Sequence, residues 1–323
     1  MKIFHKLMKK YSVKNMRAAY LILEFAITSM IASIMLLGVC SLIILMLRAM
    51  DLSRDISVAQ NRADMIFAIL RQPLEHCGYG LPKKMADWNS AFDLSHIKPF
   101  NWQSPISITT AFVGEYRENA KCRIAYAVPS KIRVLAESVT SDDIIEVQLN
   151  GKPHLLEAVT NHKYATSVKN WALFGAMLPN CRPLWMFKSQ DTLNGSTLSF
   201  KWLKPVSSDA GIFIPENDEL FYLRAMECAV IKHNDSYSFF TFDHLGTGWQ
   251  PRVEGVIDVR FELDPSGYLL KVMTLTRGNI RHSKIISPRT PDGWPEKYTN
   301  SIPDDARHYT LLARSASFEL KNF

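Results

Sequence analysis

Glu24 is the residue whose type and position most need a chemical explanation. It stands at the front edge of the stretch "FAITSMIASIMLLGVCSLIILML", in which 23 residues from Phe25 to Leu47 carry no charge. A lone ionised side chain in hydrocarbon costs roughly 3 kcal/mol by insertion measurements. A carboxylate here therefore predicts a partner cation that offsets this cost, and the chemistry we expect of Glu24 is charge pairing.

Patterns typical of catalysis or metal binding are weak elsewhere in the chain. The nine histidines are scattered, no CxxC pair occurs, and the "GYG" and "GTG" stretches match neither a phosphate-binding loop nor a dinucleotide fingerprint. We therefore expect no catalytic residue, no metal site and no cofactor, and we do not expect an enzyme.

The cysteines predict a structural role that depends on the compartment. Cys40 lies inside the apolar stretch and is expected to behave as a small hydrophobic residue. If the later part of the chain is exported to an oxidising compartment, one or two disulfides are expected among the remaining cysteines. These candidates are Cys77, Cys122, Cys181 and Cys228. They allow three pairings, and the sequence does not choose between them.

The basic residues are concentrated ahead of the apolar stretch. Of the formal net charge of +7, six positive charges come from Lys2, Lys6, Lys9, Lys10, Lys14 and Arg17. Without them the chain has 32 basic and 31 acidic residues, so the overall charge does not support nucleic acid as a partner. Only a local group keeps that partner open, namely Arg277, Arg281, Lys284 and Arg289. A basic leader predicts a cytoplasmic N-terminus.

The apolar stretch and the residues after it predict one long helix. The stretch exceeds the roughly 20 residues that cross a bilayer and is too long for a cleaved secretory signal. A plain membrane anchor fits this length but does not explain Glu24. Beyond the stretch, apolar residues repeat at spacings of three and four, which predicts a narrow seam packed on the rest of the protein. The seam residues are Leu52, Ile56, Ala59, Ala63, Ile66 and Leu70. Pro73 is expected to end the helix near Arg71 or Gln72.

The remainder of the chain is expected to be mostly antiparallel β. Runs such as "ISITTAF", "ELFYLRAMECAVI" and "YLLKVMTLTR" are rich in β-branched and aromatic residues, and the run from Val256 to Leu263 alternates with period two. "DPSG" at 264–267 predicts a tight hairpin. The expected fold is α+β, with a long N-terminal helix packed on an antiparallel β head. The expected divisions are a basic leader (1–19), the hydrophobic half of the helix (20–48), its amphipathic half (49–72) and a β-rich head (73–323).

The N-terminus resembles that of type IV prepilins and pseudopilins. Their signature is a basic leader, a small residue, an aromatic residue, and a hydrophobic run with glutamate at the fifth mature position. These positions correspond to Ala19 before the cut, Tyr20 as the first mature residue, and Glu24. The family usually has glycine and phenylalanine where this chain has alanine, which is also small, and tyrosine, which is also aromatic.

The head resembles the PilW-like minor pilins of that family. "LRQPLEHCGYGLP" (70–82) is similar to their helix exit, and "VEGVIDVRFELD" (253–264) to a late strand shared with J-type pseudopilins of type II secretion. The resemblance implies cleavage between Ala19 and Tyr20 by a prepilin peptidase and N-methylation of Tyr20. It also implies that Glu24 pairs with the terminal amine of a neighbouring subunit.

The resemblance implies a structural role in starting or capping a type IV pilus. The implied partners are other minor and major pilins, the inner-membrane assembly platform and membrane lipid. The implied location is the inner membrane, in a single pass, and then the pilus on the surface of a Gram-negative-type bacterium. A J-type pseudopilin, a DNA-binding or adhesive tip subunit, and a membrane-anchored β domain with no filament role remain as alternatives.

Overall fold

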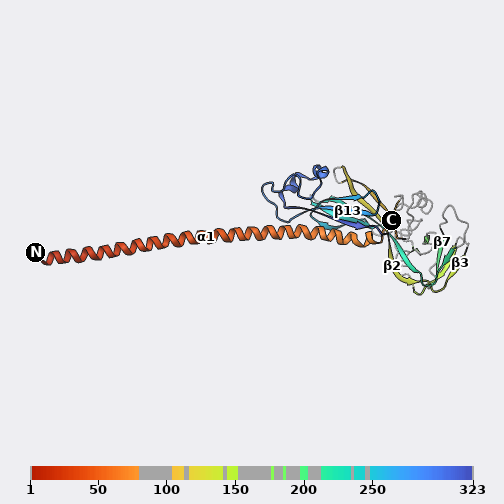
Figure 1. Ribbon diagram of the computed structural model, residues 1–323, viewed down its shortest axis with the longest axis horizontal. Coiled ribbons are helices and arrows are strands. Elements are labelled where there is room, and N and C mark those ends of the chain that lie inside the picture. The colour runs from red at the N-terminus through yellow and green to blue at the C-terminus, as the bar shows by residue number, and fades with distance from the viewer. Residues whose placement is uncertain are drawn as a thin grey trace. The chain divides into compact units, whose positions relative to one another are not determined.

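The computed structural model describes most of the chain and divides it into two compact units, Met1–Asp55 and Ile56–Phe323. The described residues are 2–79, 104–112, 116–140, 144–151, 176–177, 185–186, 197–202, 212–233, 236–243 and 248–321. We call the second unit the head. Helix α1 (Lys2–Glu75) makes up the first unit and continues into the head (Figure 1).

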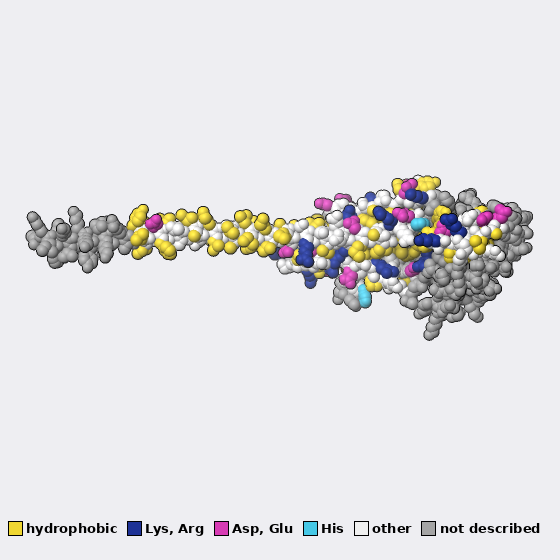
Figure 2. Space-filling view, turned by 90° about the horizontal axis from the view of Figure 1, so that it is seen from below, with side chains coloured by type: hydrophobic (Ala, Val, Ile, Leu, Met, Phe, Trp, Pro, Cys, Tyr) yellow, Lys and Arg dark blue, Asp and Glu magenta, His cyan; other side chains and the backbone are white. Residues whose placement is uncertain are grey.

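The first unit consists of helix throughout its described length. Within α1, the part from Tyr20 onward is long and apolar enough to cross a membrane, judged by length and composition. Hydrophobic side chains cover this part of the helix on the face seen in Figure 2, whereas charged side chains gather over the head. A helix that is apolar all round needs an apolar environment.

The end of α1 differs from the sequence prediction. The helix continues to Glu75 with Pro73 inside its last turn, so the predicted end at Arg71 or Gln72 was wrong. A proline in the last turn removes only its own backbone donor, and the turn still closes because the His76 N–H donates to the Gln72 carbonyl at 3.3 Å. Leu74 is completely buried, so its packing helps to offset the cost of the proline.

Within the described residues, the larger sheet of the head has six antiparallel strands. Its order is β1–β2–β9–β10–β11, with β5 also paired to β9. The strands are β1 (Ile106–Phe112), β2 (Tyr116–Arg133), β5 (Ala176–Met177), β9 (Glu219–His233), β10 (Ser236–Asp243) and β11 (Trp249–Glu254). Several of the β-branched and aromatic runs in the sequence therefore form this sheet.

The second sheet is a three-stranded antiparallel meander. It pairs β12 (Val256–Leu263) with β13 (Leu269–Arg277), and β13 with β14 (Leu311–Glu319). The predicted hairpin joins β12 to β13: Gly267 has φ +77°, and the Asp264 carboxylate accepts the Leu269 N–H at 2.8 Å. Two 3-10 helices, η2 (Glu296–Ser301) and η3 (Asp304–His308), lie between β13 and β14 in the chain.

Two further small antiparallel sheets complete the described strands. One pairs β3 (Ser138–Thr140) with β8 (Ile212–Ile214), and the other has the order β4–β7–β6. The strands of the latter are β4 (Ile144–Gln148), β6 (Trp185–Met186) and β7 (Thr197–Trp202). The fold class is thus α+β, with one long N-terminal helix and antiparallel sheets.

We call residues 56–75 the back of α1. The core of the head joins this part of the helix to the six-stranded sheet and to the β12–β13–β14 sheet. Ile66 and Leu70 of the helix belong to one buried cluster with Phe239 of β10 and Phe261 of β12. Each of these four side chains is completely buried. Strand β13 lies beside the helix, since the Thr276 hydroxyl donates to the Ala59 carbonyl at 2.7 Å. The back of α1 is therefore part of the hydrophobic core of the head.

Candidate functional site

The helix from Tyr20 to Leu47 presents its apolar side chains to the surroundings. Every large hydrophobic residue in this segment is exposed, from Tyr20 at 69% to Leu47 at 56%. The hydroxyl of Thr28 donates to the Glu24 backbone carbonyl at 2.7 Å, so this polar residue is satisfied within the helix. The Glu24 carboxylate is exposed and has no ion-pair partner within the part of the chain that the structure describes. Glu24 therefore presents its carboxylate to the surroundings of the helix.

The bond between Ala19 and Tyr20 lies inside the helical backbone of α1. In a helix, each carbonyl accepts the N–H four residues later, which keeps the peptide bonds in a closed ladder. A protease that cuts here must first break the backbone hydrogen bonds of this part of the helix. The side chain of Ala19 lies outside the described residues, and Tyr20 is exposed.

The seam residues divide into two groups. Ala59, Ala63, Ile66 and Leu70 are completely buried in the head, whereas Leu52 and Ile56 are 50% and 39% exposed. Ala59 lies where β13 approaches the helix, and its short side chain leaves room for the strand. The back of α1 is thus buried along one face, in contrast to the segment before Leu47.

Arg62 connects the helix to one end of the second sheet, where β12 begins and β13 ends. Its guanidinium donates to the Arg277 carbonyl at 2.5 Å and to Asn279 Oδ1 at 2.7 Å. It also lies against Gly255, the single residue between β11 and β12, which has φ +72°. A Cβ built on Gly255 would lie 2.7 Å from the Arg62 guanidinium. The glycine of the "VEGV" stretch is therefore favoured by its positive φ, and a Cβ at this position would displace the Arg62 guanidinium.

A buried charge cluster forms around Asp258 of β12. Asp258 is completely buried, and Arg117 and Arg260 are each 2% exposed. Arg260 donates to Asp258 Oδ2 through Nε at 3.0 Å and Nη2 at 2.8 Å, and Arg117 Nη1 lies 3.5 Å from Oδ1. Ser301 and the Val259 N–H also donate to the carboxylate, at 2.6 Å and 2.9 Å. Every carboxylate oxygen is thus satisfied, as a buried charge requires.

The outer part of this cluster is more exposed. Arg260 stacks on the ring of Tyr298 at 4.5 Å, and the Tyr298 hydroxyl donates to Glu262 Oε1 at 2.9 Å. Lys297 also pairs with Glu262. Burial raises the pKa of Glu262, but the hydrogen bonds from Lys297 and Tyr298 outweigh it and hold that pKa below its usual value. The hydrogen bond between Lys297 and Glu262 also raises the pKa of Lys297.

The arrangement of these charges fits a structural clamp. The cluster ties β12 to β2 through Arg117 and to η2 through Ser301 and Tyr298, and its central carboxylate is closed to solvent. The alternating pattern of β12 predicts a strand, but it does not predict that Asp258 and Arg260 are buried. The sequence signal that could have indicated this cluster is an acid and a base, Asp258 and Arg260, two residues apart on one face of a strand.

The candidate disulfide is not formed among the described cysteines. Cys77, Cys122 and Cys228 are free thiols and completely buried, while Cys181 lies outside the described residues. Cys122 and Cys228 are opposite each other on β2 and β9, and the Cys228 thiol donates to the Cys122 carbonyl at 3.6 Å. Burial raises the pKa of the Cys77 and Cys122 thiols well above the usual range. These three thiols therefore pack as small core residues, and a disulfide that involves Cys181 stays a prediction.

No group of three or more His, Cys, Asp or Glu residues that could hold a metal ion occurs in the described ranges. Comparison of the chain with protein-family models, with curated proteins and with solved structures gave no match. Function must therefore be inferred from the residues of this chain.

Proposed function

We propose that this chain is a PilW-like minor pilin, a structural subunit that helps to start or cap a type IV pilus. A prepilin peptidase removes residues 1–19, and Tyr20 becomes an N-methylated terminus. The mature subunit then joins other minor and major pilins at an assembly platform in the inner membrane. Its role is assembly, and it catalyses no reaction.

The observation that carries this proposal is the position of Glu24. The carboxylate stands four residues after the proposed new terminus and next to a 23-residue uncharged run. Cleavage before Tyr20 creates an α-amine, which is cationic near neutral pH. Opposite charges attract much more strongly in a low-dielectric environment than in water. An amine from an adjacent helix therefore compensates Glu24 and also sets the axial register between the two subunits.

The exposed apolar surface from Tyr20 to Leu47 supports the same role. In a single subunit these side chains contact lipid, and one segment of this length spans a bilayer. In a filament the same side chains contact the equivalent helices of neighbouring subunits. The α+β arrangement of the head, with antiparallel sheets packed on the back of α1, is compatible with a pilin fold.

N-terminal mass spectrometry of the protein from its native membrane tests the proposal. We expect a mature chain that starts at N-methylated Tyr20. Ala19→Val should block cleavage, because the residue before the cut must be small, whereas Ala18→Val is a matched control one residue earlier. A wild-type chain that retains Met1 in cells with an active prepilin peptidase would contradict the proposal and leave a membrane-anchored β protein.

A further inference from the structure

The segment after β13 combines exposed isoleucines with exposed cations. Ile280, Ile285 and Ile286 are 40%, 49% and 45% exposed. Their exposed basic neighbours are Arg281, Lys284 and Arg289. No acidic residue occurs between Asp264 and Asp292. We call residues 279–289 the basic loop.

The isoleucines of the basic loop are held outward by a fixed backbone. His282 and His308 are joined by two hydrogen bonds, from the His282 N–H to the His308 carbonyl at 2.8 Å and between His308 Nδ1 and the His282 carbonyl at 3.0 Å. Ser287 Oγ donates to the Tyr309 carbonyl at 2.6 Å and accepts the Leu311 N–H at 3.1 Å. Because both sides of the loop are tied to residues 307–311, Ile285 and Ile286 stay exposed at low conformational cost.

The basic loop leaves the sheet at one defined end of the head. Strand β13 runs alongside the helix towards Ile56: Leu270 pairs with Phe318, whose ring packs against Phe67, and Thr276 bonds to Ala59. The loop therefore begins at the end of the head that holds Ala59, near the first residue of this unit, Ile56. Only eight residues, 48–55, separate Leu47 from Ile56 in the sequence.

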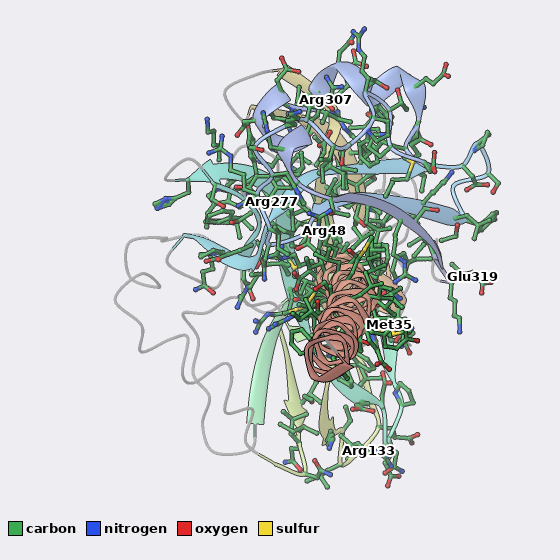
Figure 3. All side chains as sticks on the ribbon, turned by 90° about the vertical axis from the view of Figure 1, so that its left-hand side faces the viewer. Met35, Arg48, Arg133, Arg277, Arg307 and Glu319 are labelled. Carbon is green, nitrogen blue, oxygen red and sulfur yellow. The ribbon has the colours of Figure 1, made fainter. Side chains whose placement is uncertain are left out.

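The charges around the basic loop favour an anionic partner. Arg277 stacks on Tyr309 at 4.2 Å just before the loop. Arg307 belongs to the segment 307–311 that holds the loop, and its carbonyl accepts the N–H groups of Ile286 and Ser287. Figure 3 shows Arg277 and Arg307 on the side of the head opposite Arg133. The exposed acids of the segment that follows the loop are Asp292, Glu296, Asp304 and Asp305, and Asp304 is paired with Arg307 at 3.5 Å.

We propose that the basic loop is a docking surface for anionic lipid headgroups at the membrane that holds α1. The inference rests on the membrane anchorage within the proposed function, not on filament assembly. Lysine and arginine are attracted to an anionic leaflet, and adjacent apolar side chains enter the interfacial region. Nucleic acid is disfavoured as the partner because phosphates gain nothing from three exposed isoleucines, and the loop has no Phe, Tyr or Trp side chain on which bases could stack.

Fluorescence quenching in nanodiscs tests the docking with the full-length protein. A fluorophore on Ser283→Cys reports on the loop, and one on Ser266→Cys, in the hairpin at the other end of β13, is the matched control. Cys40→Ala and Cys181→Ser leave only the three buried thiols as background. The quencher is a lipid with a nitroxide on its headgroup, in phosphatidylcholine with or without phosphatidylglycerol.

We expect stronger quenching at position 283 than at 266, only in the phosphatidylglycerol discs, and a decrease at high salt. Arg281→Ser with Lys284→Ser should weaken docking by roughly 30-fold, since each basic residue near an anionic surface contributes about fivefold. Ile285→Ser with Ile286→Ser should also reduce the quenching, and charge alone does not account for that loss.

Three results would overturn the docking proposal. Equal quenching at 283 and 266 in both kinds of disc would show that the loop does not reach the lipid. Quenching that ignores lipid charge would remove the electrostatic basis. A label at 283 that responds to duplex DNA but not to phosphatidylglycerol would assign the surface to nucleic acid. Failure of the protein to enter nanodiscs would instead contradict the membrane anchor of the proposed function.

Discussion

Two carboxylates of this chain, Asp258 and Glu24, differ in whether the described residues pair them with a cation. Asp258 in the head is completely buried and bonded by Arg260, with Arg117 at 3.5 Å. Glu24 stands beside the apolar run of α1 and has no cation paired with it among the described residues. The head thus compensates its own buried charge, whereas under the proposed function the cation for Glu24 comes from a neighbouring subunit. Under the proposed function, this difference separates the folded head from the helix surface that contacts other subunits.

The largest effect on folding is expected at Asp258. Asp258→Asn keeps the shape of the side chain but leaves two buried guanidinium groups without a counter-charge, which should lower the free energy of unfolding by roughly 3–5 kcal/mol. Asp304→Asn, whose carboxylate is 91% exposed, should cost less than about 1 kcal/mol. Urea denaturation of the full chain in detergent measures both. Equal losses would mean that the cluster at Asp258 is not a clamp.

The two parts of α1 should respond differently to the same truncation. Leu70→Ala removes a completely buried side chain and should lower the free energy of unfolding of the head by about 3 kcal/mol. Leu45→Ala, at a position 60% exposed, should leave that unfolding unchanged. The same denaturation experiment applies. A similar loss at Leu45 would show that the front of the helix also belongs to the folded core.

Gly255→Ala tests the junction between the two sheets beside Arg62. The positive φ costs an alanine about 1–2 kcal/mol, and the added Cβ also displaces a guanidinium that holds Arg277 and Asn279. Gly293→Ala is the control, because its φ is +81° but its Cβ would make only ordinary contacts. We expect the loss of stability to be greater at Gly255. Equal losses would show that the contact with Arg62 carries no weight.

The smallest effect is expected at the exposed pair of Glu262 and Lys297. Because the pKa of Glu262 is lowered in the folded state, its contribution is present above the usual carboxyl pKa and is lost as the pH falls through the lowered value. Because the pKa of Lys297 is raised, its contribution is present below the usual lysine pKa and is lost as the pH rises through the raised value. Glu262→Gln should therefore cost less than about 1 kcal/mol at pH 7. The cost should vanish in acid, and a cost that persists at low pH would contradict the assignment.

Strands were predictable where a run of β-branched and aromatic residues or a turn sequence marks them. The run "ISITTAF" coincides with β1, and the "DPSG" turn forms the hairpin between β12 and β13. Strand β11 was not predicted, because only Val253 among its residues is buried and its pattern is mostly polar. The end of α1 was placed too early because burial of Leu74 overrides the local effect of Pro73.

The buried charges were not predictable from local patterns. An alternating strand ordinarily turns its polar face to water, but that face of β12 is covered by β2 and by η2, which lie far away in the sequence. Glu24 was found because its anomaly is local, since a single carboxylate adjoins an uncharged run. Asp258 was missed because its partners come together only in the folded head.

Incorporation of a Glu24→Gln variant into pili tests the central claim most directly. The amide keeps the size of the side chain but removes its charge, while Asp51→Asn, an exposed carboxylate beyond the apolar run, is the matched control. We expect the Glu24 variant to be processed and membrane-bound, with the stability of its head unchanged, but to be absent from sheared pili analysed by quantitative mass spectrometry. Pili that contain this variant at the wild-type level would contradict the account.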